Sequence, residues 1–103
     1  MYKKLILTLV TLSLISCTWV QLSDAGKGVS VVSAGDVNNC RRLGSANAQS
    51  LDKVAGVGRS NEKLQDELST LARNEAGDMG GNRVVIESAI ADGRQTFGVY
   101  SCQ

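Results

Sequence analysis

The chain of 103 residues contains no histidine and no proline, and its aromatic residues are one Trp, two Tyr and one Phe. Without histidine, acid–base catalysis near neutral pH would depend on carboxylates, lysine or tyrosine. The three cysteines are far apart, so no Cys-x-x-Cys pair suggests a metal or redox centre. We therefore expect a protein that is not an enzyme, with no catalytic residues, no metal ligands and no cofactor.

Charge and hydrophobic runs are also limited. The 11 basic and 10 acidic residues nearly cancel, whereas a nucleic-acid-binding protein usually shows a basic excess. The one long apolar run, Leu5 to Ile15, has 11 residues, and a helix that spans a bilayer needs about 20. The composition predicts neither a nucleic-acid partner nor a membrane-spanning segment.

The N-terminal segment carries the clearest signal. Lys3 and Lys4 precede the apolar run, and Ser16 and Cys17 follow it. A basic head, a short apolar stretch and a small residue before a cysteine are typical of a bacterial lipoprotein signal peptide. We expect residues 1–16 to be removed, Cys17 to be acylated, and residues 17–27 to form a lipidated tether. Thr18, rather than Asp, favours the outer membrane, with the protein facing the periplasm.

A second processing route remains open. An ordinary signal peptidase would cut after Ala25, with Ser23 and Ala25 as its pair of small residues. That site lies ten residues beyond the apolar run, whereas Cys17 lies two residues beyond it. The spacing favours the lipoprotein route. Residues 28–103 are then expected to form one small domain.

Cys40 and Cys102 remain after the signal is removed. An exported protein meets an oxidising compartment, which predicts an intramolecular disulfide. The bridge would close a loop of about 62 residues and contribute roughly 4 kcal/mol on the chain-entropy model. A redox-active or metal-binding pair is the alternative, and the wide spacing argues against it.

The pattern of the remaining chain predicts an α+β domain. One helix over 61–79 has Ser60 or Asn61 as its cap and Gly80-Gly81 as its stop. Its apolar face is formed by Leu64, Leu68, Leu71, Ala72, Ala76 and Met79. Strands are expected at 28–32, 40–46, 83–91 and 95–102, with residues 47–60 as a loop and Asp92-Gly93 as a hairpin turn. The order is β-β-loop-α-β-β, one helix packed on a small, mostly antiparallel sheet.

Three short strings carry a family resemblance: Cys40-Arg-Arg-Leu-Gly-Ser, Met79-Gly-Gly-Asn and Val99-Tyr-Ser-Cys. Together they resemble the YjeI-like small bacterial lipoproteins, which are uncharacterised. The helix-turn-strand layout is more distantly similar to the outer-membrane lipoprotein that senses stress for the Rcs phosphorelay. The resemblance implies the fold, and it implies no known activity.

These observations predict a non-enzymatic, lipid-anchored protein of the cell envelope that binds another envelope protein, as an accessory subunit or a stress sensor. The expected contact regions are the 47–60 loop and the open edge of the sheet, because unpaired strand edges recruit partners. The alternative is an envelope lipoprotein that binds a small ligand or a metal.

Overall fold

The computed structural model describes residues 20–51, 53–54, 57–58 and 60–103. The predicted signal peptide, residues 1–16, and the predicted acylation site Cys17 lie outside the described residues. The main elements are β1 (Ser30–Val32), β2 (Arg41–Gln49), α1 (Asn61–Asp78), β5 (Arg83–Ile86) and β6 (Arg94–Ser101). Shorter elements are the 3-10 turns η1 (Gly26–Gly28) and η2 (Ala34–Val37) and the strands β3 (Lys53–Val54) and β4 (Val57–Gly58).

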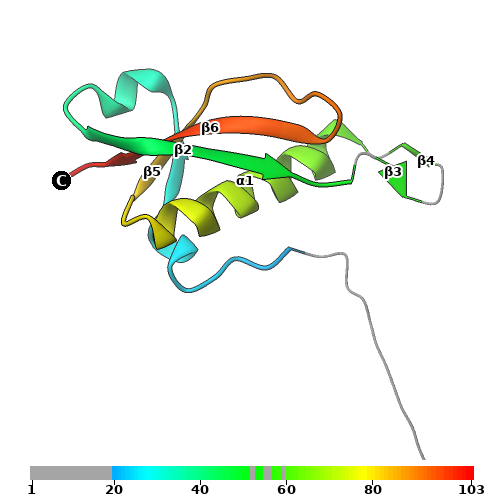
Figure 1. Ribbon diagram of the computed structural model, residues 1–103, viewed down its shortest axis with the longest axis horizontal. Helices are drawn as coiled ribbons and strands as arrows, with labels where there is room; N and C mark the ends of the chain where they lie inside the picture. Colours follow the sequence, from blue (N-terminus) through cyan, green and yellow to red (C-terminus); the bar gives the residue numbers. More distant parts are fainter. Residues whose placement is uncertain (1–19, 52, 55–56, 59) are drawn as a thin grey trace, which may run out of the picture.

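The four longer strands form one mixed sheet in the order β1-β5-β6-β2. Strand β1 runs parallel to β5, and the other neighbouring pairs are antiparallel. Helix α1 covers one face of this sheet (Figure 1). The predicted class, α+β with one helix on a mostly antiparallel sheet, is confirmed.

Helix α1 forms where the apolar spacing predicts it. The Ser60 side chain caps the helix by accepting a hydrogen bond from the Lys63 amide. Gly80 follows the helix with a φ of 87°, a conformation that glycine adopts without strain. Met79, predicted on the apolar face, is 37% exposed, because it lies beyond the last helical residue.

The core lies between α1 and the sheet. Phe97 and Val99 of β6 and Val84 of β5 are fully buried on the helix-facing side. The helix contributes Leu64, Leu68, Ala72 and Ala76 to the same cluster. Side chains alternate along β6, so Gly98 and Tyr100 lie on the opposite face, which α1 does not cover.

Two strand boundaries differ from the sequence prediction by three or more residues, and the other strand ends differ by at most two. Strand β2 continues to Gln49 instead of ending at residue 46, because Ala48 is buried in the core and residues 47–49 pair with β6. The predicted 47–60 loop therefore contains the end of β2 and the short hairpin of β3 and β4. Strand β5 ends at Ile86, since the Thr96 amide donates to the Ser88 hydroxyl in place of a strand carbonyl.

The predicted hairpin turn is confirmed. Asp92 and Gly93 have positive φ values of 53° and 73°, as a two-residue turn of this type requires. The flanking residues Ala91 and Arg94 exchange backbone hydrogen bonds of 3.0 and 2.9 Å. This turn sets the register in which β6 returns along the sheet.

The segment before β1 is packed on the helix. The Asn74 side chain donates to the Gln21 carbonyl and accepts from the Ser23 amide, both at 2.8 Å. A Cβ atom at Gly77 would collide with the backbone carbonyl of Ala25, so this glycine allows the close approach. Of the expected tether 17–27, the part from Gln21 onward thus contacts α1, and the packed domain begins earlier than residue 28.

The predicted disulfide is confirmed. Cys40 and Cys102 are bonded, with a Cα–Cα distance of 4.5 Å. The Asn82 side chain also holds the backbone of Cys102, since it accepts a hydrogen bond from the Cys102 amide at 2.8 Å and donates one to the Cys102 carbonyl at 2.6 Å. The bridge joins the residue before β2 to the residue after β6, at one end of the sheet.

Candidate functional site

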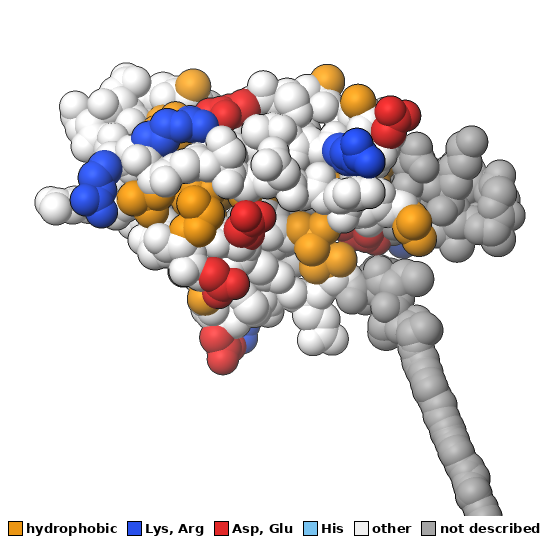
Figure 2. Space-filling view, viewed as in Figure 1, with side chains coloured by type: hydrophobic (Ala, Val, Ile, Leu, Met, Phe, Trp, Pro, Cys, Tyr) orange, Lys and Arg blue, Asp and Glu red, His pale blue; other side chains and the backbone are white. Residues whose placement is uncertain are grey.

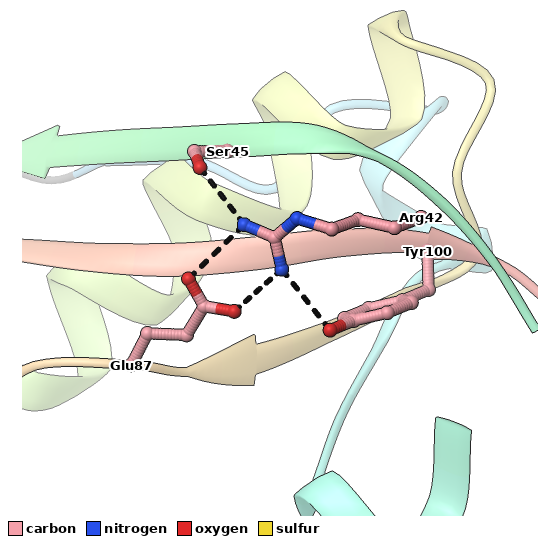
Figure 3. A network of polar contacts seen from close by, with 4 residues as sticks. All are labelled: Arg42, Ser45, Glu87 and Tyr100. Carbon is pink, nitrogen blue, oxygen red and sulfur yellow. Dashed lines mark hydrogen bonds and ion pairs between the residues drawn. The ribbon is translucent and has the colours of Figure 1, made fainter. Parts of the chain in front are cut away.

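The uncovered face of the sheet carries a four-residue polar network (Figure 3). Arg42 of β2 donates to both carboxylate oxygens of Glu87, with Nη1–Oε2 at 2.6 Å and Nη2–Oε1 at 3.2 Å. Its Nη1 also donates to the Tyr100 hydroxyl at 3.0 Å, and its Nη2 donates to the Ser45 hydroxyl at 3.1 Å. One guanidinium thus links β2, β6 and the residue that follows β5.

The register of the sheet and one glycine place this network. Arg42 pairs with Tyr100 across β2 and β6, so their side chains share one face. Gly98 lies in the next row, and a Cβ atom there would collide with the Glu87 carboxylate and approach Arg42 Nη1 to 2.6 Å. Because Gly98 has no side chain, the ion pair lies directly against the backbone of β6.

The network holds its charges fixed at neutral pH. The hydrogen bonds from Arg42 lower the pKa of Glu87 below its ordinary value of about 4.5. The same contacts with Glu87 and Tyr100 raise the pKa of Arg42, which is a cation at any physiological pH. Neither group is therefore suited to accept or release a proton at pH 7. The arrangement works as a cross-strand clamp.

A first prediction tests this clamp. Glu87→Gln is expected to lower the free energy of unfolding at pH 7 by about 0.5–1 kcal/mol, a value suited to an ion pair open to solvent. Since the folded protein lowers the pKa of Glu87, its contribution is complete above about pH 4.5 and is lost as the pH falls through the lowered pKa. Urea unfolding of both proteins across this pH range measures the difference.

The matched control is Glu75→Gln, at an exposed carboxylate on α1. We expect little change from this control at any pH. A difference between wild type and Glu87→Gln that stays constant down to strongly acidic pH would contradict the role of the ion pair.

A polar cavity of about 940 Å³ opens at the disulfide end of the sheet. It is lined by Gly35, Asp36, Asn38, Asn39, Cys40, Arg41, Arg83, Ser101, Cys102 and Gln103. Among the described residues, nothing pairs with the Arg41 side chain, and Arg83 makes one long contact, 3.4 Å, to the Asn82 carbonyl. The Asp36 carboxylate is already engaged by the Ser33 hydroxyl at 2.9 Å. The cavity therefore offers two guanidinium groups to an anion.

Charge is distributed unevenly over the molecule. In Figure 2, blue basic side chains lie at the sheet end near the C terminus and also toward the opposite end of the view, while red acidic side chains lie in the lower part of the view and beside blue ones at the top. Helix α1 carries five acidic residues, Glu62, Asp66, Glu67, Glu75 and Asp78, against Lys63 and Arg73. An anionic ligand or partner would therefore meet less repulsion at the sheet end.

Strand β2 forms one edge of the sheet. It pairs with β6 on one side, and no other strand of the described residues pairs with its free side. A bulge between Arg42 and Gly44 interrupts its first half. The second half, residues 45–49, has the sequence Ser-Ala-Asn-Ala-Gln and carries no charge.

No group of three or more His, Cys, Asp or Glu side chains in the described part of the chain is arranged to hold a metal ion. No helix in the same ranges is both long enough and apolar enough to cross a membrane. The predicted site residues Cys40 and Cys102 come together, whereas Cys17 lies outside these ranges.

Residues 20–102 match the profile of a family described as Domain of unknown function (DUF4156). The chain belongs to this family. The DUF4156 match begins at Val20, so it includes the segment packed on α1, and it ends at Cys102, so it includes both bridged cysteines. Neither the curated proteins nor the solved structures contain a match to the chain. The DUF4156 description supports neither the YjeI-like nor the Rcs assignment.

Sequence reasoning missed the network around Arg42. Arg42 is 45 positions from Glu87 and 58 positions from Tyr100 in the sequence, and no local pattern connects these three residues. One signal was available, since a single glycine inside a strand, such as Gly98, often marks a close approach of other groups. The cavity was also missed, because it depends on the pairing of β2 with β6, which places Arg41 opposite Ser101.

Proposed function

We propose that this protein is a lipid-anchored lipoprotein of the bacterial cell envelope, held in the outer membrane through Cys17 and facing the periplasm. It is non-enzymatic and binds another envelope protein. The open edge of β2 is the observation that carries the binding role. The Cys40–Cys102 disulfide supports export, because such bonds persist in oxidising compartments.

The packing of the N-terminal segment favours anchoring at Cys17 over a cut after Ala25. A chain that began at Gly26 would lack Gln21 and Ser23, and Asn74 would lose both partners. It would also lack the first residues of the family match, which starts at Val20. The intact mass of the native protein tests this part. We expect an acylated N terminus at Cys17, and an unmodified protein beginning at Gly26 would contradict the anchor.

The exposed edge of β2 is suited to a partner strand. Proteins usually protect an edge with charged residues, proline or a bulge. Here the bulge and both arginines lie in the first half, and residues 45–49 have none of these features. Ala46 and Ala48 are buried against the core, so the other side of this stretch carries the polar, uncharged side chains of Ser45, Asn47 and Gln49. An extended segment of another protein can therefore add a strand through main-chain hydrogen bonds.

The two resemblances suggest two forms of this binding role, an accessory subunit or a stress sensor. The YjeI-like lipoproteins are uncharacterised and have no known activity, so that resemblance is consistent with an accessory subunit. The more distant similarity to the Rcs stress-sensing lipoprotein suggests a sensor. In both roles the same edge would bind the partner.

The second prediction is that a partner protein binds at the free edge of β2. Site-directed photo-crosslinking in cells tests it. A photoreactive residue in place of Gln49, an exposed position on β2, is expected to capture one protein reproducibly. The matched control places the same residue at Glu75 on α1, which is also exposed. Capture from both positions at equal yield, or from neither, would contradict binding at the β2 edge.

Binding of a small anion is the second candidate function, and the cavity beside the disulfide favours it. Titration of the purified, oxidised domain with succinate or with inorganic phosphate, followed by NMR, separates a carboxylate ligand from a phosphate. The side-chain amides of Asn38 and Asn39 should shift, and Arg83→Gln should abolish the shift. Arg94→Gln, beside the distant hairpin turn, should preserve it. No shift with either anion would remove this candidate.

A further inference from the structure

The chain leaves the domain on the exposed side of α1. Figure 1 shows the segment before β1 running along α1, on the side of the helix away from the sheet. Val20 lines a small hollow together with Lys63, Asp66, Glu67 and Thr70, all of which belong to α1. The first described residue therefore lies against the helix, with the sheet behind it.

Several contacts hold this segment in place. Asn74 binds Gln21 and Ser23, and a Cβ atom at Gly26 would collide with Asn74 Oδ1, which shows how closely the two pack. Arg73 Nε donates to the Val29 carbonyl at 2.7 Å, just after the segment turns toward β1. The segment thus behaves as part of the domain, and it does not act as a free linker.

The remaining distance to the anchor is short. Three residue steps separate Cys17 from Val20, and a fully extended chain covers at most about 11 Å in three steps. A tether of residues 17–27 would have allowed about 35 Å. A helix with its side chains is about 10 Å thick. To reach the far face of the sheet, the chain would have to pass both the helix and the sheet, and its reach of about 11 Å is close to the thickness of the helix alone. A lipid on Cys17 therefore cannot lie at the uncovered face of the sheet.

We propose that in the anchored protein α1 faces the membrane, while the uncovered face of the sheet, with the Arg42 network and the cavity, faces away from it. This inference rests on the proposed acylation of Cys17. It deepens the proposed function, because it defines the side from which a partner approaches. That partner is a protein reaching the sheet from the aqueous compartment, and the membrane surface itself is on the other side.

The charge of α1 does not itself draw the helix to a membrane, so the short chain to the anchor has to hold it there. The helix carries five acidic and two basic residues, so it is not attracted to an anionic lipid surface. The short chain alone keeps it there. Lengthening the chain before Val20 should therefore release the domain, and this gives the proposal a direct control.

Paramagnetic lipids provide the experiment. The native, acylated protein is placed in nanodiscs that contain a small share of lipid with a gadolinium chelate on its headgroup, and amide relaxation is measured by NMR. We expect relaxation enhancement several-fold larger at Asp66 and Thr70 of α1 than at Gly98 and Tyr100 of β6. Equal enhancement on both elements, or larger enhancement on β6, would overturn the proposal.

Two further samples distinguish a failure of the proposed acylation from a failure of the proposed orientation. A Gly-Ser insertion of about 12 residues before Val20 spans about 20 Å and should remove the difference between α1 and β6. If the native protein carries no lipid, its mass contradicts the proposed function. The orientation is then read on protein coupled chemically to a maleimide lipid through Cys17. Equal enhancement in that sample would overturn the orientation by itself.

Discussion

Replacing Cys40 and Cys102 by serine is expected to lower the free energy of unfolding by about 4 kcal/mol, because the disulfide closes a loop of 62 residues. Domains of this size are stable by roughly 5–15 kcal/mol in total. The variant should therefore have a much lower urea midpoint, and its level in the cell should fall. Urea unfolding and quantitative immunoblotting measure the two effects.

The control for this prediction is the wild-type protein in the presence of reductant. Reduction leaves both cysteines in place, so it separates the loss of the bond from the loss of the side chains. Both samples should unfold at similar urea concentrations. Unchanged melting temperature and abundance in the double variant would contradict a stabilising role for the bridge.

The second large effect is expected at the centre of the core. Phe97→Ala should destabilise the domain by about 3–5 kcal/mol, because it removes a large, fully buried side chain and leaves a cavity. Loss of thermal stability, measured by circular dichroism, should be accompanied by a lower refolding yield. This variant keeps the disulfide, so it tests the core independently.

Val31→Ala on β1 is the matched control for the core. Val31 is a strand residue that is 41% exposed, so its truncation should lower the free energy of unfolding much less than the truncation of Phe97 does. A similar loss of stability in the two variants would mean that the region around Phe97 adjusts to fill the space. The core would then be less tightly packed than its burial implies.

The parts of the fold that follow local rules could be predicted from the sequence. Helix α1 shows a clear apolar period, with Leu64 and Leu68 one turn apart, and capping residues at its start. The turn at Asp92 and Gly93 is equally local. The end of β2 was missed because alanine, asparagine and glutamine have weak strand propensity. Its extended form depends on pairing with β6, which is distant in sequence.

The N-terminal segment shows a different limit. Ser23, Ala25 and Gly26 are small or polar, so they resemble a linker and show no apolar period. They pack on α1 because Gly77 leaves room for the Ala25 backbone and Asn74 supplies hydrogen bonds. Such packing depends on small residues in two separate parts of the chain, and a reading of one segment alone cannot detect it.

The position of the disulfide also determines what a protease can release. Cleavage of any single peptide bond between residues 40 and 102 leaves two pieces that stay covalently joined through the bridge. The β3–β4 hairpin lies inside this closed loop, and so do α1 and β5. A single cut there would leave β6 tied to the same N-terminal piece as β1. The whole domain would thus remain attached to the N-terminal segment after being nicked.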